Sequence, residues 1–157
     1  MFRDPHVEVS HMPPSLPIRA AIGFLAAALA VLTFHQGMIG LLYAAKIPGL
    51  LIGNPPYPMR AVGPLGIPAI ANLMFWGGLY GLVFGVLAPR FRWPLWLCGL
   101  LTGILASLVG MFIVAAIKGT PVGGGWNALN WARSFLINGS FGLGLGLIYP
   151  QLLRFTR

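Results

Sequence analysis

Four long apolar segments alternate with short polar ones along this chain. The apolar segments cover about residues 19–45, 67–88, 93–117 and 134–153, and each has the ~20 residues that a helix needs to cross the hydrocarbon core of a bilayer. Charged side chains lie only between the segments or at their ends. Since burying one at mid-bilayer costs about 2.5–3.5 kcal/mol, the pattern predicts an all-α integral membrane protein, a four-transmembrane-helix bundle.

The composition supports this prediction. Hydrophobic residues make up 57% of the chain and charged residues 8%, whereas soluble domains carry about 25% charged residues. The net charge is +8, but the basic side chains stand in ones and twos at the ends of the predicted helices. That placement is typical of anchoring to anionic lipid headgroups, so we expect the lipid bilayer, and not nucleic acid, as a partner.

The distribution of Lys and Arg also predicts an orientation. Residues 1–17 are polar and rich in proline, which predicts a disordered cytoplasmic tail, and residues 18–157 form the transmembrane domain. With four spans both termini lie on one side. That side would carry six basic residues (Arg3, Arg19, Arg90, Arg92, Arg154 and Arg157), against four on the other (Lys46, Arg60, Lys118 and Arg133). The positive-inside rule then favours cytoplasmic termini.

The second and fourth segments resemble each other at an offset of 61 residues. The matching positions are Gly78, Gly81, Leu82, Gly85 and Pro89 with Gly139, Gly142, Leu143, Gly146 and Pro150. The first and third segments match less well at an offset of 73, through Leu32, Gly37 and Met38 with Leu105, Gly110 and Met111. Two tandem helical hairpins of equal orientation would explain the pattern, and chance agreement in a Gly- and Leu-rich sequence is the alternative.

Pairs of glycines four residues apart occur in three of the segments. They are Gly81 with Gly85, Gly99 with Gly103, and Gly142 with Gly146. Such pairs let two helices approach closely, which favours helix packing in lipid through van der Waals contact. We expect this packing to be mostly internal, although a second chain could also use these faces.

A few polar residues interrupt the apolar segments at similar depths. They are His35 and Gln36, Trp76 of the second segment, Ser107 of the third, and Asn138 and Ser140 of the fourth. We call these six residues the polar layer. Polar side chains inside a membrane either bond across helices or form a functional site, so the layer could hold the bundle together or contact a ligand.

Catalytic and metal-binding chemistry is poorly supported. Asp4 and Glu8 are the only acidic residues, so carboxylate acid–base pairs are excluded from the spans. Cys98 is the only cysteine and His35 the only histidine within the predicted spans, which argues against a disulfide framework or a multi-ligand metal site within one chain. We therefore expect no catalytic residues, no metal and no cofactor. The sequence favours a protein that is not an enzyme.

The connection between the first two segments, residues 46–68, contains six prolines together with many apolar side chains. Proline prevents a regular helix there. An apolar segment that is not helical is expected to lie back on the bundle or on the membrane interface, as a cap or as a docking surface.

Several motifs resemble those of a group of uncharacterised bacterial four-helix inner-membrane proteins. They are Phe34-His35-Gln36-Gly37, the Pro-rich stretch Asn54 to Pro58, Gly66-Ile67-Pro68 and Phe75-Trp76-Gly77-Gly78. The likeness covers residues 18–153 and implies a bacterial inner-membrane location and four helices. It implies no activity and no functional residue.

Two functions remain open from the sequence. The first is a structural or accessory component of a membrane assembly, in which the Pro-rich loop or the Gly-rich faces of the second and fourth helices dock a larger membrane-protein partner. The second is a small homo-oligomeric transporter or channel that uses the polar layer around His35 and Gln36 for a neutral or anionic solute. A haem- or metal-binding redox subunit comes third.

Overall fold

The computed structural model describes residues 14–50 and 52–156, so most of the predicted N-terminal tail lies outside the described residues. Four helices in the described part are long and apolar enough to cross a membrane: Leu16–Ala45, Ala69–Arg90, Leu95–Ile117 and Ala128–Arg154. The prediction of an all-α four-helix bundle is confirmed, and each of the four helices overlaps one of the four apolar segments.

Each spanning helix is assembled from the following elements. The first contains α1 (Leu16–Ala30), the π-helical segment η1 (Val31–His35) and α2 (Gln36–Ala45). The second contains α3 (Ala69–Leu87) and the 3-10 turn η2 (Ala88–Arg90), and the third contains α4 (Leu95–Leu108), the π-helical segment η3 (Val109–Val114) and α5 (Ala115–Ile117). The fourth is α6 (Ala128–Arg154). Between them lie an antiparallel pair of two-residue strands, β1 (Ala61–Val62) and β2 (Ile67–Pro68), and the turn η4 (Val122–Trp126).

Helix ends follow from local chemistry. Lys46 takes a left-handed conformation, with φ of 49°, and ends α2. Pro68 and Pro94 stand directly before α3 and α4, where proline does not interrupt helical hydrogen bonding. The side chain of Asn127 accepts a hydrogen bond from the backbone N–H of Leu129 at 2.9 Å, which caps α6. This helix therefore begins at Ala128, although its apolar segment begins only at residue 134.

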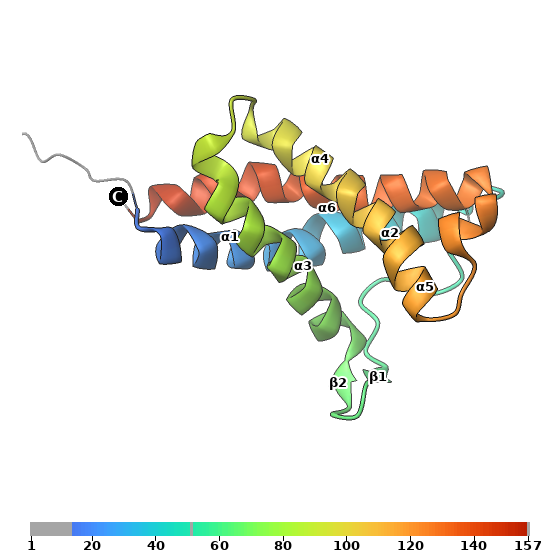
Figure 1. Cartoon of the computed structure of the whole chain (residues 1–157). Helices are drawn as coiled ribbons and strands as arrows, with labels where there is room; N and C mark the ends of the chain where they lie inside the picture. Colours follow the sequence, from blue (N-terminus) through green and yellow to red (C-terminus); the bar gives the residue numbers. More distant parts are fainter. Residues whose placement is uncertain (1–13, 51, 157) are drawn as a thin grey trace, which may run out of the picture.

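The four helices form two antiparallel hairpins. α1 packs along α3, α4 packs along α6, and α1 and α6 contact each other between the two pairs (Figure 1). By contrast, α3 and α4 are joined by a short turn but have few contacts with each other. We refer to the end of the bundle with the two longer connections, residues 46–68 and 118–127, as the loop end. The start of α1 and the end of α6 lie together at the opposite end (Figure 1).

Glycines mark the tightest contacts of both hairpins. A β-carbon at Gly81 would overlap the carbonyl oxygen of Gly23, and one at Gly85 would overlap that of Arg19. The second hairpin repeats this arrangement, because β-carbons at Gly142 and Gly146 would overlap the backbone of α4 at residues 99 and 95. The Gly-rich faces of α3 and α6 are thus filled by α1 and α4 of the same chain.

The packing gives the true register between the two hairpins. Gly23 lies against Gly81 and Gly85 as Gly99 lies against Gly142 and Gly146. The second and fourth helices are therefore related by the predicted offset of 61, but the first and third helices by 76. This differs from the predicted offset of 73, whose matches did not include the two glycines that pack equivalently, Gly23 and Gly99. The first helix of each hairpin also contains a π-helical segment, in the half nearer the loop end.

The core joins the two hairpins. Phe84 of α3 and Tyr149 of α6 are almost fully buried, and their rings meet edge to face with centroids 5.5 Å apart. The Tyr149 hydroxyl donates to the Gly85 carbonyl at 3.4 Å. On α1 the fully buried positions at this junction are the small residues Ala26, Ala27 and Ala30. Small side chains let this helix contact α3 and α6 together.

Candidate functional site

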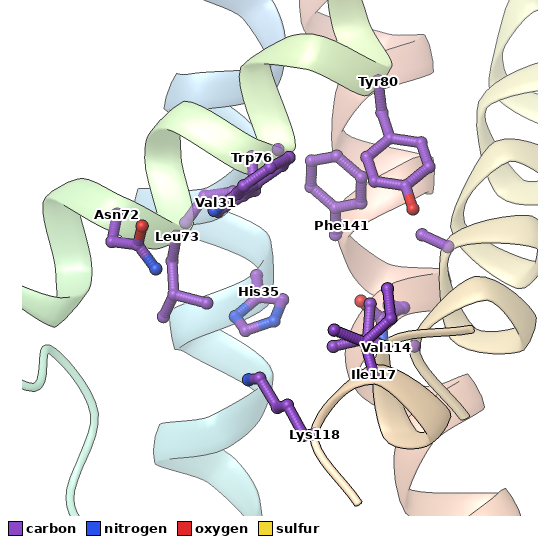
Figure 2. A pocket seen from close by; sticks show the side chains of 14 residues that line it. Val31, His35, Asn72, Leu73, Trp76, Tyr80, Val114, Ile117, Lys118 and Phe141 are labelled. Carbon is purple, nitrogen blue, oxygen red and sulfur yellow. The ribbon is translucent and has the colours of Figure 1, made fainter. Parts of the chain in front are cut away.

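A cleft of about 560 Å³ opens in the loop-end half of the bundle, between α3 and the third spanning helix. We call it the cleft. Its base is formed by η1 and α6, and its two walls by α3 and by the α4–η3–α5 helix (Figure 2). Its volume is within the range of about 300–1,000 Å³ that is typical of ligand pockets. The lining residues are Val31, His35, Asn72, Leu73, Trp76, Gly77, Tyr80, Ala106, Gly110, Val114, Ile117, Lys118, Asn138 and Phe141.

The cleft exists because its two walls diverge. α3 is held against α1 by its own glycines, and α4 is held against α6 by the equivalent set. Neither contact requires α3 and α4 to meet, and Gly110 has no side chain to fill the space. A β-carbon at Gly110 would meet no atom within 4 Å, whereas one at Gly77 would collide with Val31. The cleft can therefore be filled from the Gly110 side without disturbing the packing.

Polar groups converge on this otherwise apolar space. His35 comes from η1, Asn72 from the first turn of α3 and Lys118 from the end of α5, and Figure 2 shows their side chains on the same side of the cleft. Among the described lining residues Lys118 alone carries a charge. The residues that the structure describes include no acidic side chain, so none of them forms an ion pair with that ammonium group.

The structure divides the polar layer that the sequence predicts. His35, Trp76 and Asn138 line the cleft. Ser107 is buried instead between α4 and α6, where its hydroxyl donates to the Ser134 carbonyl at 3.0 Å. Asn138 donates to the same carbonyl at 3.1 Å. Ser140 is half-buried in α6 and does not line the cleft.

Gln36 has a structural role, through a partner that the sequence did not indicate. Its side chain is fully buried, and its Oε1 accepts a hydrogen bond from the backbone N–H of Tyr57 at 2.6 Å. The Tyr57 hydroxyl donates to the carbonyl of Leu32 at 3.0 Å, within the π-helical segment. At the loop end Arg133 donates to the Gly49 carbonyl at 3.0 Å. These bonds confirm that the Pro-rich connection lies back on the bundle.

The interpretation of His35 and Gln36 as cross-helix bonds is not supported. Within the described residues, the side-chain hydrogen bond of His35 is with its neighbour Gln36, between Nδ1 and Nε2 at 3.3 Å. Gln36 in turn bonds to a loop residue and not to another helix. His35 is therefore free to present its ring to the cleft.

Three further residues with polar groups line the cleft but are not among the candidates from the sequence: Asn72, Tyr80 and Lys118. Asn72 and Tyr80 lie four residues before and after Trp76, so one stripe of α3 faces the cleft. This helical spacing was the signal that could have found them. Lys118 was assigned only to the membrane boundary.

A second, apolar groove of about 400 Å³ adjoins the cleft. It runs between α3 and α4 toward the end opposite the loops, and it shares Trp76 and Tyr80 with the cleft. We call it the apolar groove. Its other lining residues are Leu79, Val83, Phe84, Leu87, Thr102 and Leu105. Polar groups near the loops thus give way to hydrocarbon from the cleft to the adjoining groove.

Comparison of the chain with models of known protein families, with curated proteins and with solved structures found no match. Within the described residues, no group of three His, Cys, Asp or Glu side chains is placed to hold a metal ion. The chemistry of the cleft must therefore be inferred from its own geometry.

The His35→Ala variant is expected to unfold with a free energy within about 1 kcal/mol of the natural protein, since it loses one hydrogen bond to a neighbouring side chain. Gln36 keeps its bond to Tyr57 in this variant. Thermal unfolding in mild detergent, followed by intrinsic fluorescence, measures the change. A loss of several kcal/mol would mean that His35 ties the bundle together.

Proposed function

We propose that this protein binds an amphiphilic molecule from the bilayer, in the cleft and the adjoining apolar groove. The observation that carries the proposal is the path between α3 and α4, which is polar near the loops and apolar beyond Trp76 and Tyr80. A molecule with a polar head and a hydrocarbon body matches both parts. Carriage of such a molecule would develop the second function expected from the sequence, the handling of a neutral or anionic solute.

The accessory role expected from the sequence receives less support. It depended in part on the Gly-rich faces of the second and fourth helices, which would dock a larger partner. In this structure those faces pack against α1 and α4. The Pro-rich loop, which is the other proposed docking surface, is bonded to the first helix through Tyr57.

Location and orientation belong to the same proposal. We place the protein in a bacterial inner membrane with cytoplasmic termini, on the basis of the motifs around His35 and of the Lys and Arg distribution. The cleft would then open in the outer half of the bilayer. Lys118 directly follows the third spanning helix, where a lysine can extend its ammonium group to the interface.

A photoreactive fatty alcohol tests the proposal with a neutral probe. A diazirine in its chain should label peptides of α3 and of the α4–η3–α5 helix when the full chain is reconstituted in phosphatidylcholine nanodiscs. The Gly110→Phe variant should reduce this labelling about tenfold, the effect of about 1.4 kcal/mol in binding free energy, because a phenyl ring would occupy the cleft.

The matched control is Gly37→Phe. Gly37 is exposed, lies in a spanning helix and has open space around a β-carbon, as Gly110 has, but it does not line the cleft. Labelling should be unchanged in this variant. Labelling that is spread evenly over all four helices, or that survives Gly110→Phe, would contradict the proposal.

A further inference from the structure

We infer that the ligand of the cleft is a single-chain amphiphile with a monoanionic carboxylate head, of the fatty-acid class. This inference rests on the proposed function and specifies the ligand. The carboxylate would lie at Lys118, with His35 and Asn72 beside it, and the hydrocarbon chain would pass Trp76 and Tyr80 into the apolar groove.

The charge of the head follows from the lining. Lys118 contributes the one positive charge among the described lining residues, and the chain has no acidic residue beyond position 8. A cationic head would meet an uncompensated like charge at the loop end of the cleft, where the exposed Lys118 lies, and like charges at short range repel each other. An anionic head would instead form a charge-assisted hydrogen bond with the ammonium group, which is stronger than a neutral one.

The number of charges follows from the single lysine. A phosphate monoester carries about −1.5 to −2 charges at pH 7, so Lys118 would leave part of that charge unpaired in the cleft. A carboxylate carries a single charge, which one ammonium group matches. The other polar side chains beside it, on His35 and Asn72, can donate hydrogen bonds without adding a second full charge.

The shape of the site favours one chain. The apolar groove is a single path between two helices, about 400 Å³ in volume, with α1 and α6 closing the bundle behind it. Its lining residues change from the aromatic pair Trp76 and Tyr80 to aliphatic side chains such as Val83 and Leu87. One extended hydrocarbon chain therefore has continuous apolar contact from the head to the far end.

Displacement of the photoreactive fatty alcohol tests the inference. In phosphatidylcholine nanodiscs that contain the full chain, an unlabelled fatty acid should displace the probe at about tenfold lower concentration than the fatty alcohol of equal length, since a hydrogen bond to a charged group is worth more than a neutral one. The fatty amine and the alkyl phosphate should both displace it less well than the acid. Lys118→Gln should remove the advantage of the acid over the alcohol.

The matched control is Lys46→Gln, which removes another exposed lysine next to a spanning helix but does not alter the cleft. The acid should keep its advantage in this variant. Equal displacement by acid, alcohol and amine, or an equal loss in both lysine variants, would overturn the inference while leaving the proposed function intact. Failure of the alcohol itself to label the cleft, with cross-links to a second copy in its place, would overturn both.

Discussion

Replacing Gly142 with alanine is expected to lower the free energy of unfolding by about 3 kcal/mol, because extra atoms in a well-packed interface force backbone shifts that cost about 1–3 kcal/mol or more. A β-carbon at this position would overlap the carbonyl oxygen of Gly99 and lie 2.6 Å from the backbone nitrogen of Gly103. These neighbours are backbone atoms of α4, which cannot move aside as the end of a side chain can. The hairpin of α4 and α6 would have to separate.

The measurement is the unfolding transition in mild detergent, together with the yield of monodisperse protein. Gly37→Ala is the control, since a β-carbon there would meet no atom within 4 Å. Alanine is the better helix former, so this variant should be more stable by about 0.5–1 kcal/mol. If Gly142→Ala unfolded at the same temperature as Gly37→Ala, the close contact between α4 and α6 would be refuted.

Replacing Gln36 with leucine is expected to cost about 2–3 kcal/mol, which is the upper part of the range for leaving a buried hydrogen-bonding group without a partner. The variant removes the acceptor of the Tyr57 N–H. Tyr57 has a φ of 59°, and a non-glycine residue in this region carries strain that the surrounding contacts must offset. The Pro-rich connection should therefore lose its fixed position on the first helix.

Hydrogen exchange of the Tyr57 amide reports this change directly, and thermal unfolding gives its size. Tyr57→Phe provides the comparison, because it removes only the hydroxyl bond to the Leu32 carbonyl and should cost about 1 kcal/mol. A Tyr57 amide that exchanges as slowly in Gln36→Leu as in the natural protein would show that the side chain of Gln36 does not anchor the loop.

The fold was largely predictable because lipid imposes strong constraints on sequence. A spanning helix must be apolar over most of its length, so the four spanning segments can be identified from the sequence. The early start of α6 could not be predicted in this way. Ala128 to Arg133 extend the helix beyond the apolar segment, and the cap at Asn127 sets where this extension begins. The offset of 76 between the first and third helices could not be predicted either. Leu, Gly and Met are so frequent in these helices that several alignments match equally well. Only the packing around Gly23 and Gly99 identifies the equivalent positions.

The site was predictable only in part, and the reason is geometric. The position of a residue along its helix gives its depth in the membrane, but depth alone does not say which way a side chain faces. His35, Trp76 and Asn138 share the cleft, whereas Ser107 turns into the interface between α4 and α6. The partner of Gln36 is a residue of an irregular loop, and no helical periodicity could have indicated it.

The glycine pairs illustrate a further limit of the sequence. Gly81 with Gly85 and Gly142 with Gly146 predicted close helix packing, but the sequence allowed a partner in the same chain or in another. The structure assigns α1 to the first pair and α4 to the second. Because these internal contacts hold α3 and α4 in separate hairpins, they also leave the cleft between them. Packing and candidate site therefore have a common origin.

The most direct test of this account is an experimental structure of the full chain in lipid nanodiscs to which a fatty acid has been added. We expect four spanning helices, α3 and α4 apart at the loop end, and an elongated density that begins at Lys118 and passes Trp76 into the apolar groove. A closed cleft in which α3 and α4 touch along their length, or a helix of another chain in place of the ligand, would contradict it.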